Sequence, residues 1–174
     1  MKLLKKIIYF FRWGFPGDIA TSRISSKVKL GKNHIFINAT ISGKHISIGD
    51  FSSIADNSQI LSRFESIEIG ERVSIGPNVL IQNYTHNKDF LITNYKALSK
   101  KYGEEEFQNI LGKTASSISI GDDVWIGANC VIFPGTKIGS GTIIGANSVV
   151  KGDIPSMQIW AGSPAKLISK RDIN

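Results

Sequence analysis

Residues 120 to 150 repeat with a period of six, and this period leaves the chain very few folds to choose from. The sixes read IGDDVW, IGANCV, IFPGTK, IGSGTI and IGANSV, followed by Val150. Each six begins with Ile, its fourth residue is Asp, Asn or Gly, and its fifth residue is small or of modest size. A fixed period with such residue preferences at each position is the signature of a solenoid.

The period has a direct structural explanation. Each six supplies one short strand and one corner, so three sixes close a triangular coil that stacks on the next coil at about 4.8 Å. The leading aliphatic side chain points inward and contacts its copy one coil later, as Ile120 would contact Ile138 and Ile126 would contact Ile144. The fourth residue turns the corner in a left-handed backbone, which suits Gly and is tolerable for Asn or Asp.

The ordered motifs resemble those of a known family. Hexads at 48–60 and 69–81 precede His86, a polar stretch follows, and VWIG, PG and AGSPAK then begin at residues 124, 134 and 161. This order, over about residues 48–170, resembles the hexapeptide-repeat acyltransferases, in particular the sugar and xenobiotic O-acetyltransferases that use acetyl-CoA. The resemblance implies an all-β fold, a left-handed parallel β-helix, whose handedness is an exception to the usual crossover rule.

The sequence divides into three predicted parts. Residues 1–27 form a basic amphipathic N-terminal segment, 28–160 form the β-helix, and 161–174 form a C-terminal cap. The period is lost over 83–117, which predicts an extruded loop with a short helix within 96–107. Ser163 and Pro164 are a good N-cap and first-turn pair, so we expect a short helix from about Pro164 to Lys170.

The net charge of +7 is concentrated at the N-terminal end, where residues 1–33 carry eight Lys or Arg and one acid. The uncharged run Ile7–Phe11 is far shorter than the ~20 residues of a membrane span. Residues 1–16 therefore either cap the first coil or join subunits, or else rest on an anionic membrane face. Both readings fit a cytoplasmic protein, and the second adds peripheral contact at the inner face of the membrane. Nucleic acid is not an expected partner, because no binding motif is present.

His86 is the candidate catalytic base. It matches the family's histidine just past a coil, at the mouth of the loop. Transfer of an acetyl group to a hydroxyl requires removal of the hydroxyl proton during attack, and imidazole suits this near neutral pH. Many sugar acetyltransferases have Pro after this histidine, whereas Asn87 follows here.

The chain has two other histidines and one cysteine. His34 and His45 are expected at the surface or in turns, and Cys130 at an inward position as a small core residue. The same fold hosts zinc carbonic anhydrases, which need three histidines at one metal. Two of those three histidines lie close together in sequence. The three histidines of this chain are far apart in sequence, so no metal site is predicted.

The acceptor and donor sites are expected from the resemblance. Acceptor candidates are Asn57, Ser62, Arg63 and Asn83. Asn57 is at a corner position, where the turn alone accounts for an Asn without any role in binding. The family binds its donor in a groove between two subunits of a homotrimer. The matching donor positions are Trp125, Ala128, Gly145, Ala146, Lys151, Ser163 and Lys166.

The expected function is acetyl-CoA-dependent O-acetylation of a carbohydrate acceptor. The short basic start resembles the branch that modifies surface polysaccharides, O-antigen or capsule precursors. The alternatives are N-acetylation of a nucleotide-linked amino sugar, acetylation of an antibiotic, and a non-catalytic scaffold, which would leave the His86 motif unexplained.

Overall fold

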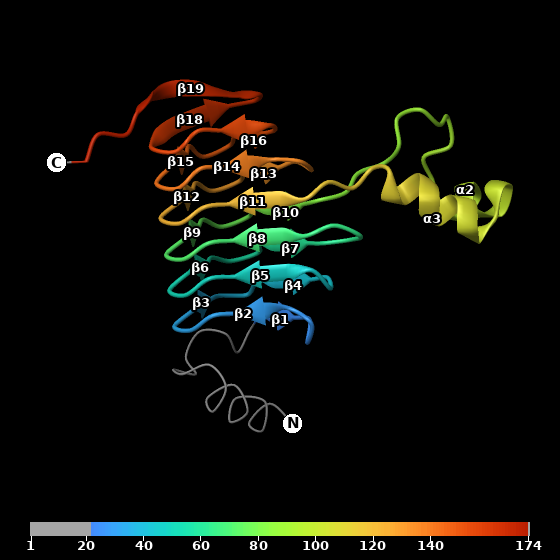
Figure 1. The fold of residues 1–174 in the computed structure, drawn as a ribbon, viewed down its shortest axis with the longest axis horizontal. Coiled ribbons are helices and arrows are strands. Elements are labelled where there is room, and N and C mark those ends of the chain that lie inside the picture. The colour runs from blue at the N-terminus through green and yellow to red at the C-terminus, as the bar shows by residue number, and fades with distance from the viewer. Residues whose placement is uncertain (1–21, 174) are drawn as a thin grey trace.

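The computed structural model describes residues 22–173, which form a three-sided solenoid with a helical arm on one side (Figure 1). Every coil contributes one strand to each of three parallel sheets, here called A, B and C. The left-handed parallel β-helix is therefore confirmed. Residues 1–16, for which a cap or membrane contact is expected, lie outside the described part.

Each sheet stacks strands from successive coils. Sheet A holds β1 (Arg23–Ile24), β4 (Thr40–Ser42), β7 (Gln59–Leu61), β10 (Leu80–Gln82), β13 (Val131–Ile132) and β16 (Val149–Val150). Sheet B holds β2 (Lys29–Leu30), β5 (Ile46–Ile48), β8 (Ile67–Ile69), β11 (Ile118–Ile120), β14 (Lys137–Ile138) and β17 (Asp153–Ile154). Sheet C holds β3 (Ile35–Phe36), β6 (Ser53–Ile54), β9 (Ser74–Ile75), β12 (Trp125–Ile126), β15 (Ile143–Ile144), β18 (Gln158–Gly162) and β19 (Ala165–Lys170).

The register confirms the inward ladder. Ile120 pairs with Ile138 and Ile126 with Ile144, and all four side chains are buried. The fourth hexad residues are left-handed as predicted, with φ of 56° at Asp123, 58° at Asn129 and 59° at Asn147. Removing one Leu or Ile side chain from water contributes about 1.5–3 kcal/mol, so the ladder supplies most of the stability of the rod.

The solenoid begins earlier than the predicted residue 28, because β1 already pairs with β4. Ile24 is opposite Ile41 and Ile41 is opposite Ile60, separations of 17 and 19 residues instead of 18. One short and one long coil therefore compensate each other. This explains why the sequence period fails near Ser42 although the ladder continues through the buried Ile41.

The small inward side chains are not all apolar. Ser58 donates to the Gly76 carbonyl at 2.8 Å and accepts from the Val79 amide at 3.1 Å, and Ser52 does the same with Gly70 and Val73. Because buried polar groups require partners, these hydroxyls tie each corner to the next coil.

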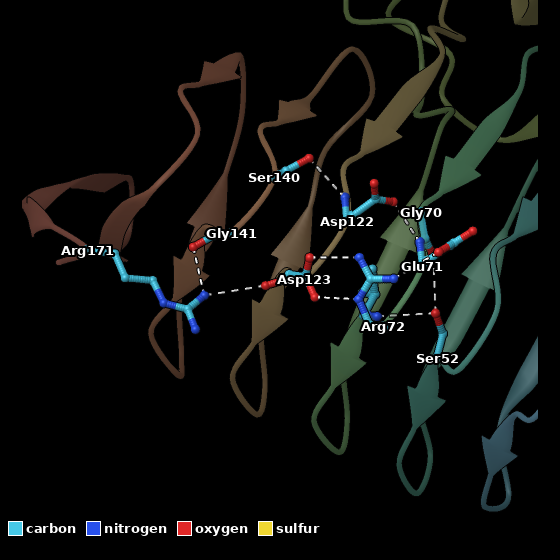
Figure 2. Close-up of polar contacts among 10 residues, drawn as sticks. Ser52, Gly70, Glu71, Arg72, Asp122, Asp123, Ser140, Gly141 and Arg171 are labelled. Carbon is cyan, nitrogen blue, oxygen red and sulfur yellow. Dashed lines mark hydrogen bonds and ion pairs between the residues drawn. The ribbon is translucent and has the colours of Figure 1, made fainter. Parts of the chain in front are cut away.

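The corner between sheets B and C carries a ladder of charges that the period does not predict (Figure 2). Arg72 makes two hydrogen bonds to the Asp123 carboxylate, at 2.7 and 3.0 Å, and a third to Glu71. Its hydrogen bonds hold the pKa of Asp123 below its usual value. Near the C-terminus, Arg171 donates to the carbonyls of Gly141 and Asp123. The ladder thus joins four levels of the corner.

The predicted helix from Pro164 to Lys170 is wrong. This segment is β19, which runs antiparallel to β18. Gly162, at φ 105°, begins the turn between them. A seven-residue helix is marginal on its own, whereas a strand satisfies the exposed edge of β18. Pairing with β18 therefore outweighs the helix-start signal at Ser163.

The excursion over 83–117 contains two helices, α2 (Tyr95–Tyr102) and α3 (Glu104–Gly112), where one short helix is predicted within 96–107. Asn94 caps α2 by accepting from the Ala97 amide, and Gly103, at φ 81°, separates the helices. The helices share a small core of Leu98, Phe107, Ile110 and Leu111. Among residues 22–173, neither helix is long and apolar enough to cross a membrane.

Candidate active site

The candidate site lies at the corner between sheets A and B, called corner AB below. Two departures from the period occupy this corner on consecutive coils: residues 62–66 between β7 and β8, and the excursion between β10 and β11. The paired coils therefore bring Arg63 beside Asn83 although 20 residues separate them in sequence.

His86 is exposed and held by the excursion itself. Its Nδ1 atom lies 2.9 Å from the carbonyl oxygen of Thr93, and its ring stacks on Tyr95 with centroids 4.5 Å apart. A carbonyl oxygen only accepts hydrogen bonds, so Nδ1 is the donor, and in the neutral tautomer that this bond selects the lone pair is on Nε2. The imidazole is thus oriented as a base, with the same logic as a histidine fixed by a partner in a hydrolase triad.

Tyr95 connects His86 to Arg63. The Arg63 guanidinium lies 5.9 Å from the centroid of Tyr95 and 5.4 Å from that of Tyr84, both within cation–π range. Burial raises the pKa of the Tyr95 hydroxyl, and the nearby Arg63 charge only partly offsets this. The predicted acceptor residue Arg63 therefore lies one aromatic ring from the predicted base.

Asn83 plays a structural part instead of the predicted acceptor contact. Its side chain is fully buried, its amide donates to the carbonyls of Glu65 and Ser66, and its oxygen accepts from the Arg63 amide at 2.9 Å. With these groups engaged, the side chain fastens residues 62–66 to the start of the excursion.

The other acceptor candidates separate in space. Ser62 lies on corner AB and donates to the Glu65 carbonyl at 2.9 Å. Asn57 lies on the corner between sheets C and A, called corner CA, where it is left-handed and accepts from Asn38 at 3.0 Å. The structure therefore brings Ser62, but not Asn57, to the His86 corner of the same chain.

A narrow slot opens beside the segment that carries His86. It has a volume of about 110 Å³ and lies between Tyr84–Thr85 on one side and Phe133–Pro134 on the other, with Leu80 and Val131 of sheet A also lining it. A slot of this size accommodates a thin chain or a small acyl group, not a sugar ring.

The donor candidates lie on another edge of the solenoid. Ala128, Gly145 and Ala146 follow β12 and β15 on corner CA, and a Cβ on Gly145 would come 2.8 Å from Ala161. Ser163 and Lys166 are exposed in the β18–β19 hairpin next to them. Trp125 is 54% exposed on sheet C. Lys151, between β16 and β17, is the one donor candidate on corner AB. One chain therefore places the base and most donor positions on different edges.

Two of the remaining candidates are in the core. Cys130 is buried as predicted, and burial raises the pKa of its thiol, which disfavours the nucleophilic thiolate. His34, expected at the surface or in a turn, lies in the connection between β2 and β3 but is buried, and it stacks on Phe36 with centroids 4.9 Å apart. Within residues 22–173, no group of three His, Cys, Asp or Glu side chains is placed to hold a metal ion.

Comparisons with known proteins agree with this geometry. The family model described as bacterial transferase hexapeptide, six repeats, matches residues 117–152. A protein of Escherichia coli K12 named as a lipopolysaccharide biosynthesis O-acetyl transferase, WbbJ, is 34% identical over 155 residues, covering 88% of this chain and 70% of its own length. The chain belongs to the hexapeptide-repeat acetyltransferases.

Solved hexapeptide-repeat acetyltransferases show the same architecture. The Vibrio cholerae acetyltransferase VCA0836, in complex with acetyl coenzyme A, has a TM-score of 0.67 and 30% identity over 83% of this chain and 72% of its own. A galactoside acetyltransferase in complex with coenzyme A has a TM-score of 0.65 and 26% identity over 98% of this chain and 81% of its own. Other related acetyltransferases are matched over only 43% or 51% of their length.

Proposed function

We propose that this acetyltransferase transfers the acetyl group of acetyl-CoA to a sugar hydroxyl of a surface-polysaccharide, O-antigen or capsule precursor. The observation that carries the proposal is the hydrogen bond between His86 Nδ1 and the Thr93 carbonyl, which leaves Nε2 free to accept a proton. The E. coli relative named for O-acetyl transfer in lipopolysaccharide biosynthesis supports the same class.

In this mechanism His86 removes the acceptor proton as the hydroxyl oxygen attacks the thioester carbonyl. The C–S bond breaks, the coenzyme A thiolate leaves and takes the proton from His86, and the acetyl ester remains on the sugar. A hydroxyl needs such a base more than a neutral amine does, so a histidine oriented by its Nδ1 hydrogen bond favours O-acetylation over the N-acetylation alternative. Backbone amides of the donor groove would hold the oxyanion.

The complete site needs more than one copy of the chain. Because His86 and most donor positions lie on different edges, a neighbouring subunit must supply one of them. The outward residues of sheet B are polar, among them Lys29, Glu68 and Lys137, whereas sheets A and C present half-buried or exposed apolar residues (Leu80, Val131, Val149, Trp125, Ile143 and Ile159). Extended apolar faces of this kind mark interfaces, which supports the homotrimer.

The proposed setting is the cytoplasmic side of the membrane, where precursors of surface polysaccharides would meet acetyl-CoA. The basic composition of residues 1–16 supports peripheral contact there. Flotation with vesicles that contain anionic lipid, compared with neutral vesicles, tests this part.

The decisive experiment measures acetyl transfer and donor binding together. Purified protein is incubated with acetyl-CoA and a panel of sugar acceptors, and release of free thiol is followed. Acetyl-CoA binding is measured by calorimetry on the same samples, and subunit number by light scattering. Acetyl-CoA binding without transfer to any hydroxyl acceptor, combined with transfer to amines, would replace the O-acetylation proposal with the N-acetylation alternative.

A further inference from the structure

A second cavity lies on corner AB, along the two coils that precede the excursion. Its volume is about 560 Å³, within the range of sites for small ligands. It is bounded by Gly43, Lys44 and His45 from one coil, by Ser62, Arg63 and Phe64 from the next, and by Gln108 of α3. Gln108 of the excursion therefore adds one wall to a hollow that two solenoid corners otherwise form.

The charge of this hollow is one-sided. Lys44, His45 and Arg63 line it, and no Asp or Glu does. Glu104 accepts hydrogen bonds from Gln108, which lines the hollow, and from Ser99, while Glu65 accepts one from Ser117 at 3.2 Å. Over residues 22–173, the only ion pairs are those of Arg72 with Glu71 and Asp123, so neither Lys44 nor Arg63 has an acidic partner.

Arg63 is also positioned in advance. The rings of Tyr84 and Tyr95 hold its guanidinium, whose N–H donors have no hydrogen-bond partner within residues 22–173. A planar guanidinium with free donors recognises phosphate by paired hydrogen bonds. Through Tyr95, the same side chain is one ring away from His86.

We propose that this cavity binds the diphosphate group of an activated acceptor sugar, with Arg63 and Lys44 as its ligands. The inference deepens the proposed function and rests on it, because it identifies the acceptor as a glycosyl diphosphate instead of a free sugar. The size of the cavity matches a diphosphate with part of its attached group. The diphosphate can be joined to a nucleoside or to a lipid, and the chemistry at Arg63 is the same for both.

The test is a calorimetric titration with inorganic pyrophosphate in the presence of saturating coenzyme A, which keeps the probe out of the donor groove. The unaltered protein is compared with Lys44→Ala, Arg63→Gln and the double variant. Lys137→Ala, which removes an exposed lysine from sheet B, is the matched control. Loss of a charged hydrogen-bond partner should weaken pyrophosphate binding about tenfold in each single variant, and Lys137→Ala should leave it unchanged.

The source of the diphosphate is identified by competition against pyrophosphate with UDP and with geranyl diphosphate. Tighter competition by UDP assigns a nucleotide-linked acceptor, and tighter competition by geranyl diphosphate assigns a lipid-linked one. Absence of pyrophosphate binding at about 1 mM, or equal weakening in Lys137→Ala, overturns the proposal. The titration needs no acetyl transfer, so its failure is distinguishable from failure of the O-acetylation proposal.

Discussion

The Nδ1 atom of His86 lies 2.9 Å from the carbonyl oxygen of Thr93, and both residues belong to the excursion instead of the solenoid. The base and the group that orients it therefore move together. The coils contribute to this geometry through the start of the excursion at β10 and through Arg63, which contacts the Tyr95 ring.

Replacing His86 by Ala should abolish catalysis and leave the fold intact. The loss of a general base costs about 10²–10⁴-fold in turnover. The side chain is exposed, so the free energy of unfolding should change by no more than about 0.5 kcal/mol. Turnover and acetyl-CoA affinity are measured on the same sample, with Lys137→Ala, an exposed residue of sheet B, as control. More than about a tenth of the parental turnover would remove His86 from the mechanism.

Tyr95 should act as a positioning residue through its ring and not its hydroxyl. Tyr95→Phe keeps the stacking on His86 and Arg63 and should keep most of the turnover, whereas Tyr95→Leu should lower kcat about tenfold, because each aromatic contact contributes about 1 kcal/mol. Acetyl-CoA affinity should be equal in both variants. A kcat that falls equally in Tyr95→Phe would point instead to a role for the hydroxyl.

His34 should make the stability depend on pH. Its ring is buried, and burial lowers its pKa below the ordinary value of 6.5, an effect that the Ser52 and Gly31 backbone and the Asp50 charge only partly offset. The unfolded chain then binds the proton more readily, so stability is complete above about pH 6.5 and falls as the pH decreases below it.

The matched variant is His34→Val, because Val73 and Val124 occupy the same inward position on sheet C. Thermal unfolding at pH 7.5 and 5.5 is compared, and a change of about 1 kcal/mol corresponds to roughly 2–4 °C for a chain of this size. The variant should lose part of the decrease in Tm, and His45→Gln should not. Equal decreases in all three proteins would contradict this account.

Asn129 should tolerate Gly but not Val. Its backbone is left-handed at φ 58°, a conformation that costs other residues about 1–2 kcal/mol and glycine little. Asn129→Val should therefore lower the free energy of unfolding by at least that amount, since it also loses the side-chain bonds to Asn78 and Asn147. Chemical denaturation of both variants measures the difference, and equal stability would refute the assignment of this corner.

The hexads predict the rod well because each inward Ile lies opposite its copies on adjacent coils, so the spacing in the sequence sets this register. Ile120 and Ile138 illustrate this. The C-terminal strand is missed since the open edge of β18 is a tertiary feature that favours strand over helix. The site is found only in part: a motif identifies His86, but Thr93 and Tyr95 follow no period, and only the folded excursion brings them to it. Lys44, on the corner between β4 and β5, follows no period either.

The excursion also separates the solenoid into two folding units. Adjacent strands are normally 18 residues apart, as with Trp125 and Ile143, but Ile67 and Ile118 are 51 apart. Closing the longer loop costs about 0.9 kcal/mol more in chain entropy, from (3/2)RT ln(51/18). Coils after Ile118 can form from near contacts alone, so we expect them to assemble early. The join between β8 and β11 then forms late, and with it the surface that carries His86.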